Sequence, residues 1–134
     1  MDLQNIARRS FYLRLIYALC LCGATWMHLQ VTLAHGLGWD YGGVAQLTRI
    51  YWTSLTFIDP LAVLLLLVVP RVGLIVCVAV IVTDVAHNSW FALHNPIRLD
   101  LYLSQIAFLL FVACTVRTAW RGAAVRREMS RVIN

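Results

Sequence analysis

Apolar residues fill four long runs of the chain, and short polar or glycine-containing segments separate them. Each run is long enough to cross the hydrocarbon core of a bilayer as a helix, which takes about 20 residues. The predicted spans cover residues 11–33, 47–69, 72–93 and 99–120. The pattern therefore predicts an all-α polytopic membrane protein, a single domain over residues 1–134 that folds as an antiparallel bundle of four transmembrane helices.

Helix-breaking residues lie between the runs. A glycine-rich loop at residues 36–43 follows the first run, and Pro70-Arg71 makes a turn so tight that the second and third runs should form an antiparallel hairpin. A second short turn at residues 94–98 precedes the fourth run. We expect a short basic arm over the first ten or so residues, and a basic tail at 121–134 that forms an amphipathic helix on the membrane surface.

Composition agrees with a membrane protein, because 61% of the residues are hydrophobic and only 13% are charged, far too apolar for a soluble domain of this size. All eleven basic residues are arginines, and they lie at the ends of the apolar runs. That position is typical of topology determinants and argues against a nucleic-acid partner. Only Arg49 and Arg98 fall on the side opposite the termini, so both termini should be cytoplasmic. An all-arginine basic set indicates a GC-rich bacterial gene and hence a bacterial cytoplasmic membrane.

Several side chains have an expected structural role. We expect Arg14 to snorkel at the start of the first span. The four cysteines lie inside the spans and are interpreted as small apolar core residues: Cys20, Cys22, Cys77 and Cys114. Six aromatic residues near the outer interface are interpreted as its aromatic belt: Trp39, Tyr41, Tyr51, Trp52, Trp90 and Tyr102.

The third span contains an unusual polar segment. Asp84, His87 and Asn88 stand at i, i+3 and i+4, so a helix places all three on one face. An aspartate at this depth costs roughly 2.5 kcal/mol or more unless it faces a partner or a cavity. This face is therefore the first candidate for function.

Depth along the helices brings further polar side chains to the same level. With a rise of about 1.5 Å per residue, Asp59 lies about 15 Å and Asp84 about 18 Å from the cytoplasmic end. His28, His87 and Gln105 come out near 22 Å, and Thr32, Thr53 and Thr56 lie at a similar level or slightly nearer the outer surface. All four spans thus contribute to one polar layer between the bilayer centre and the outer interface, whereas the cytoplasmic half has almost no polar groups beyond its cysteines.

Asp59 is followed by Pro60, which cannot donate a hydrogen bond to the carbonyl of Thr56. The second span should therefore kink beside a buried acid. The kink would either open a pocket at this depth or only serve packing. The sequence leaves open whether Asp59 and Asp84 share a proton, pair with histidines or bind a cation.

The pattern His28-x-x-x-Thr32 in the first span and Trp52-x-Ser54-x-x-x-x-Asp59 in the second resembles the EXPERA domain. This is the four-helix membrane family of the emopamil-binding sterol isomerase and the sigma-2 receptor. The resemblance implies that Asp59 stands where the family has a pocket glutamate, and that His28 and Thr32 line the pocket. It also implies a sterol-like or amphiphilic, often cationic ligand, and in some members isomerisation by proton transfer.

Three functions follow from these observations. The first is binding of a lipid-like or amphiphilic small molecule without a cofactor, with Asp59 and Asp84 as anchors or proton carriers, which leaves open whether the protein is an enzyme. The residues expected to bind this ligand are His28, Thr32, Thr56, Asp59, Asp84, His87, Asn88 and Gln105.

The second is a haem- or metal-binding subunit of a membrane redox complex, because Asp84-x-x-His87 has the spacing of metal sites in helix bundles. Its expected ligands are His28, Asp84 and His87. The third is a structural or assembly subunit in which the layer only fixes helix packing. A homodimer and membership of a larger complex both remain open.

Overall fold

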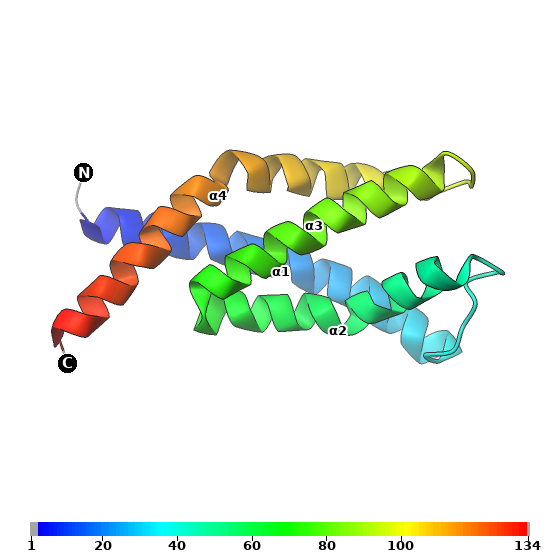
Figure 1. Ribbon diagram of the computed structural model, residues 1–134, viewed down its shortest axis with the longest axis horizontal. Coiled ribbons are helices and arrows are strands. Elements are labelled where there is room, and N and C mark those ends of the chain that lie inside the picture. Colours follow the sequence, from blue (N-terminus) through cyan, green and yellow to red (C-terminus); the bar gives the residue numbers. More distant parts are fainter. Residues whose placement is uncertain (1–2, 134) are drawn as a thin grey trace.

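The computed structural model describes residues 3–133, with side chains for residues 3–125. It contains four helices and no strand in that part of the chain (Figure 1). The helices are α1 (Leu3–His35), α2 (Gln46–Val68), α3 (Pro70–Ala92) and α4 (Leu99–Ile133). All four are long and apolar enough to cross a membrane, which confirms the predicted all-α fold class.

The helices run alternately in opposite directions, and each packs against its neighbours in the sequence (Figure 1). Helix α4 also packs against α1 and closes the ring, whereas α1 and α3 lie diagonally and touch little. Both chain ends lie at the same end of the bundle as the α2–α3 turn. We call this the arginine end, and we call the opposite end, with the 36–45 and 93–98 loops, the loop end.

Helix boundaries follow the local chemistry. Gly36, with φ +79°, ends α1 in the left-handed region that glycine adopts without steric cost. Pro70 begins α3, where its missing N–H and fixed φ are favourable. The predicted basic arm is helical from Leu3 onward, and the predicted tail continues α4 to Ile133. The side chains of Arg126, Arg127 and Arg131 lie outside the described part.

Two glycines let helices approach at the arginine end. A Cβ atom at Gly73 would overlap the backbone of Leu65 and Leu66, so α2 and α3 touch through main-chain atoms. A Cβ atom at Gly122 would overlap Ser10 on α1, whose hydroxyl donates to the Ala119 carbonyl oxygen at 2.6 Å. Small residues at helix crossings are typical of membrane bundles, where close packing replaces the hydrophobic effect between helices.

Many large apolar side chains face outward on all four helices, for example Leu19, Leu33, Leu64 and Leu110. A soluble monomer rarely exposes so continuous an apolar surface, but it is what helices surrounded by hydrocarbon require. Together with the length and hydropathy of the four helices, this surface makes the chain an integral membrane protein.

The prediction that the cysteines lie in the core is wrong for three of the four. Cys77 is fully buried, but Cys20, Cys22 and Cys114 are exposed on the outside of the bundle. The physical reason is that a bilayer accepts a small apolar side chain as readily as the protein interior does. Apolar character in a membrane helix therefore does not indicate which face is buried.

The prediction that Arg14 snorkels toward the interface is also wrong. Its side chain is only 1% exposed, and it donates a hydrogen bond to the carbonyl oxygen of Leu66 on α2. That carbonyl belongs to the last turn of α2, where carbonyls have no intrahelical donor. The residue four positions on is Pro70, which has no N–H to offer. Arg14 therefore satisfies the negative end of a helix from inside the bundle.

The half near the arginine end consequently holds more polar contacts than predicted. Besides Ser10 and Arg14, Tyr17 is fully buried, and its hydroxyl lies 2.6 Å from the hydroxyl of Thr115 on α4. Thr115 also donates to the carbonyl oxygen of Phe111. These contacts link α1 to α2 and to α4, so this half is held together by hydrogen bonds as well as by apolar packing.

Candidate functional site

The polar layer predicted from the sequence forms in the half of the bundle toward the loop end. Asp59 on α2 is 1% exposed and Asp84 on α3 is 8% exposed, so both carboxyl groups are buried. The helices that carry these two groups, α2 and α3, pack against each other. Figure 1 shows α2 bent near its middle, where Pro60 interrupts the helical hydrogen bonds.

Asn88 is the centre of the hydrogen-bond network in this layer. Its side-chain amide nitrogen donates to Asp84 Oδ1 at 3.2 Å and to Gln105 Oε1 on α4 at 2.9 Å. Its Oδ1 accepts from the indole N–H of Trp52 on α2 at 3.1 Å. One side chain thus connects α2, α3 and α4. The structure brings Asp84, Asn88 and Gln105 together.

The threonines of the layer join α1 to α2. The hydroxyls of Thr32 and Thr56 lie 3.2 Å apart. Thr56 is one helical turn before Pro60, and it is buried next to the bend in α2. These two candidate residues are therefore in contact, on the side of the layer away from Gln105.

His87 lies in a cluster of aromatic rings that includes Trp52, the residue that donates to Asn88. Its ring centroid is 4.7 Å from that of Tyr51, 6.1 Å from that of Trp52 and 5.8 Å from that of Trp90. Its Nε2 is buried and has no hydrogen-bond partner among the described residues. The three-residue face expected on α3 is thus divided between a hydrogen-bonded part and an aromatic part.

Sequence reasoning missed the hydrogen bonds of Trp52 and Tyr51. It assigned both residues to an interfacial belt and named Trp52 also in the pattern that resembles the EXPERA domain. Trp52 is a donor in the network, and Tyr51 donates to the hydroxyl of Thr83 at 3.2 Å. The sequence signal that could have indicated these contacts was the position of both residues on α2, two helical turns before Asp59. At that spacing a tryptophan N–H can reach the same layer as the acid.

The remaining histidines are separate from this network. His28 on α1 is partly buried, His35 stacks on Trp39 with ring centroids 3.9 Å apart, and the ring of His94 lies 6.0 Å from that of Trp90. Within the described residues, no three His, Cys, Asp or Glu side chains come close enough together to hold a metal ion. The structure therefore does not assemble His28, Asp84 and His87 into a ligand set.

Asp59 Oδ1 is a buried oxygen with no hydrogen-bond partner among the described residues. Among the described residues, the ion pair joins Arg98 to Asp100 at the loop end, and neither buried acid takes part in it. A buried polar atom without a partner costs about 1–3 kcal/mol, and such atoms in native proteins are explained by strain, by a catalytic role or by a bound water or ion. The arrangement can accept a hydrogen bond or a positive charge at Asp59.

The fold and the layer define a class: a small four-helix integral membrane protein with two buried acids in one half of the bundle. Comparison of the chain with protein-family models, with curated proteins and with solved structures finds no match.

Replacing Asn88 with alanine should lower the free energy of unfolding by about 2 kcal/mol. The change removes three hydrogen bonds and leaves Asp84, Gln105 and the Trp52 N–H without this partner. Unfolding of the purified protein in mixed micelles, followed by circular dichroism, measures the effect. Asn95→Ala is the control, because Asn95 is exposed and its side chain donates to the Phe91 carbonyl oxygen at the end of α3, away from the network. Equal stability of the two variants would contradict the network.

Proposed function

We propose that this protein binds a lipid-like or amphiphilic small molecule with a protonated amine, and that the polar layer holds it. The observation that carries the proposal is Asp59, a fully buried carboxyl group with one oxygen unpaired among the described residues. A second buried acid, Asp84, lies on the adjacent helix, and neither is paired with a described basic side chain. A cation would offset the cost of burying these acidic groups.

The other residues of the layer have complementary roles. Asn88 holds the Asp84 carboxyl group, while Thr32 and Thr56 offer hydroxyls on the α1 side of Asp59. The rings around His87 would stabilise an ammonium group by cation–π interaction. The resemblance to the EXPERA family implies the same class of ligand. If the ligand is converted and not only held, Asp59 and Asp84 are the groups that would transfer the proton.

The arginines support the orientation that this proposal uses. Five exposed or half-buried arginines lie at the arginine end, namely Arg8, Arg9, Arg71, Arg117 and Arg121, against Arg49 and Arg98 at the loop end. By the positive-inside rule the termini are then cytoplasmic, and the polar layer is nearer the outer leaflet of a bacterial cytoplasmic membrane. The ligand would enter from that leaflet.

Hydrophobic amines should raise the thermal stability of the purified protein, and uncharged isoprenoid alcohols of similar size should not. A ligand at one hundred times its Kd stabilises by about 2.7 kcal/mol, which is several degrees for a domain of this size. Asp59→Asn should fold normally but lose the shift, because the isosteric amide cannot neutralise the amine. Asp100→Asn is the matched control, since Asp100 is exposed beside Arg98, and it should keep the whole shift.

Two results would contradict the proposal: no amine stabilises the wild-type protein, or Asp59→Asn binds as tightly as wild type. The three-helix network of Asn88 favours a second candidate, in which the layer only fixes helix packing. In that case Asn88→Ala loses stability while no ligand stabilises any variant.

A further inference from the structure

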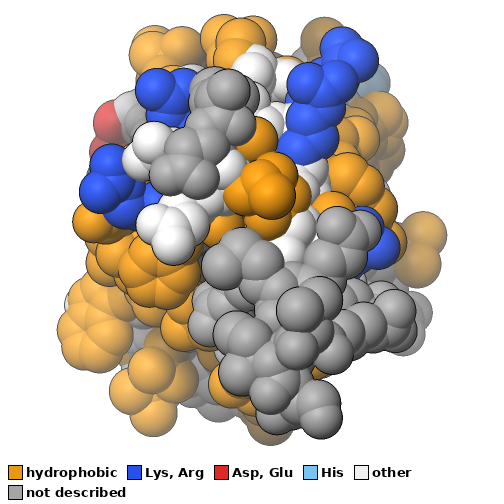
Figure 2. All heavy atoms as spheres, turned by 90° about the vertical axis from the view of Figure 1, so that its left-hand side faces the viewer, with side chains coloured by type: hydrophobic (Ala, Val, Ile, Leu, Met, Phe, Trp, Pro, Cys, Tyr) orange, Lys and Arg blue, Asp and Glu red, His pale blue; other side chains and the backbone are white. Residues whose placement is uncertain are grey.

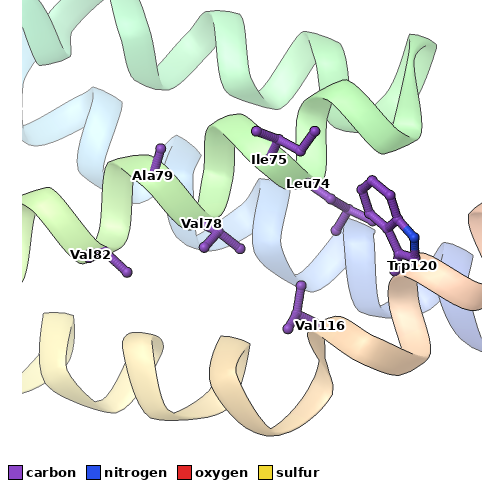
Figure 3. A pocket seen from close by; sticks show the side chains of 7 residues that line it. All are labelled: Leu74, Ile75, Val78, Ala79, Val82, Val116 and Trp120. Carbon is purple, nitrogen blue, oxygen red and sulfur yellow. The ribbon is translucent and has the colours of Figure 1, made fainter.

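An apolar groove runs along the outside of the bundle between α3 and α4, toward the arginine end (Figure 3). Its volume is about 400 Å³, within the range of small-molecule sites. Its lining residues are Leu74, Ile75, Val78, Ala79, Val82, Val116 and Trp120. From Leu74 to Val82 the groove follows α3 for about 12 Å. It is thus separate from the polar layer described above.

The groove is exposed to the hydrocarbon of the bilayer. Ile75 and Val82 on α3, and Trp120 on α4, are all large apolar side chains with substantial exposed surface. Because the helices span the membrane, what meets these side chains is a lipid chain and not water. An elongated apolar groove parallel to a membrane helix matches the shape of one acyl chain.

The end of the groove near the termini is positively charged. The Arg71 guanidinium carbon lies 5.4 Å from the centroid of the Trp120 ring, which itself lines the groove. Arg71 stands in the first turn of α3, a turn that no side chain caps, so the helix dipole adds positive potential there. Arg117, one turn before Trp120 on the same side of α4, and Arg121 are exposed close by.

This positive charge has no described acidic counterpart. The described acids are Asp40 in the 36–45 loop, Asp59 and Asp84 in the layer, and Asp100 in the first turn of α4, all in the half toward the loop end. Figure 2 views the arginine end and shows arginine side chains at several places among apolar ones. A ligand that fits both features has an apolar chain and a negatively charged head.

We propose that the α3–α4 groove binds an anionic phospholipid, with one acyl chain along the groove and the headgroup phosphate at Arg71. Arginine binds phosphate strongly because its planar fork of donors matches the oxygen geometry. The Trp120 ring fixes the guanidinium at the groove end by cation–π interaction. With the termini cytoplasmic, the site faces the leaflet in which anionic lipids interact with basic segments.

Tryptophan quenching by brominated lipids tests this proposal in neutral detergent micelles. Phosphatidylglycerol with brominated acyl chains should quench Trp120 with an affinity about fivefold higher than brominated phosphatidylcholine, the value expected for one arginine near the phosphate. Trp120→Phe identifies the Trp120 contribution among the five tryptophans. Arg71→Gln should remove the preference between the lipids, and Ala79→Phe should fill the groove and weaken quenching by both. Arg98→Gln, at the loop end, should change neither.

Three results of the quenching experiments would overturn the proposal. They are equal affinity for the two lipids in the wild-type protein, a preference that survives in Arg71→Gln, and quenching that Ala79→Phe leaves intact. Glycerol phosphate, which has the headgroup chemistry but no chain, should not displace the brominated lipid. If it does so fully, the site binds free phosphate and the phospholipid proposal is wrong.

Discussion

Replacing Gly73 with alanine should strongly destabilise the native α2–α3 hairpin. A Cβ atom at this position would overlap the backbone nitrogen and Cα of Leu66 and the carbonyl carbon of Leu65. Backbone atoms cannot move aside as a flexible side chain can, so the two helices would have to separate. Overpacking of this kind costs about 3 kcal/mol or more, a large share of the stability of a domain this small.

Gly23→Ala is the control for this prediction. Gly23 is also a helical glycine, in α1, but no heavy atom of another element lies within 4 Å of an added Cβ. Its replacement should leave stability unchanged or raise it slightly, because alanine is the better helix former. Size-exclusion profiles and unfolding in mixed micelles would compare the two variants. A Gly73→Ala protein as monodisperse and stable as Gly23→Ala would show that the helices do not cross so closely.

The fold could be predicted because its signals are local. Long apolar runs, the glycine loop at 36–43 and the Pro70 turn fix where helices begin and end. The polar layer could be predicted because helical rise converts sequence position into depth. Asp84, Asn88 and Gln105 therefore meet as expected.

Depth does not indicate how each helix is rotated about its own axis, and this rotation decides which side chains face the interior of the bundle. Apolar residues surround α1 almost completely, so its apolar pattern does not distinguish the lipid-facing side of the helix from the buried side. That is why the exposed Cys20 and Cys22 were assigned to the core, and why the aromatic rings around His87 were not foreseen. The locations of these side chains depend on which helices pack together.

The burial of Arg14 could have been inferred from one further chemical argument. Pro70 has no N–H, and α2 ends just before it, so the Leu66 carbonyl needs a donor from elsewhere. Arg14 is the donor that the structure supplies. Orphaned carbonyls near prolines therefore indicate where a polar side chain at similar depth will point.

Replacing Arg14 with alanine should lower the free energy of unfolding by about 3 kcal/mol. The change creates a cavity where a fully buried side chain lay, and it leaves the Leu66 carbonyl without its Arg14 donor. Some of this loss is offset because a buried charge is no longer desolvated. Arg14→Met keeps most of the side-chain volume, so it should lose less stability than Arg14→Ala. The difference between the two variants in free energy of unfolding measures the cost of the cavity.

The matched control is Arg9→Ala, five residues earlier on α1, where the side chain is exposed. An exposed arginine contributes little to stability, so this variant should stay within about 0.5 kcal/mol of wild type. Unfolding in mixed micelles measures all three variants under one condition. If Arg14→Ala were as stable as Arg9→Ala, the bond to Leu66 would only compensate for burying the guanidinium. If instead Arg14→Met lost as much stability as Arg14→Ala, packing would not be what holds α1 against this turn. The hydrogen bond and the positive charge at the end of α2 would then hold it.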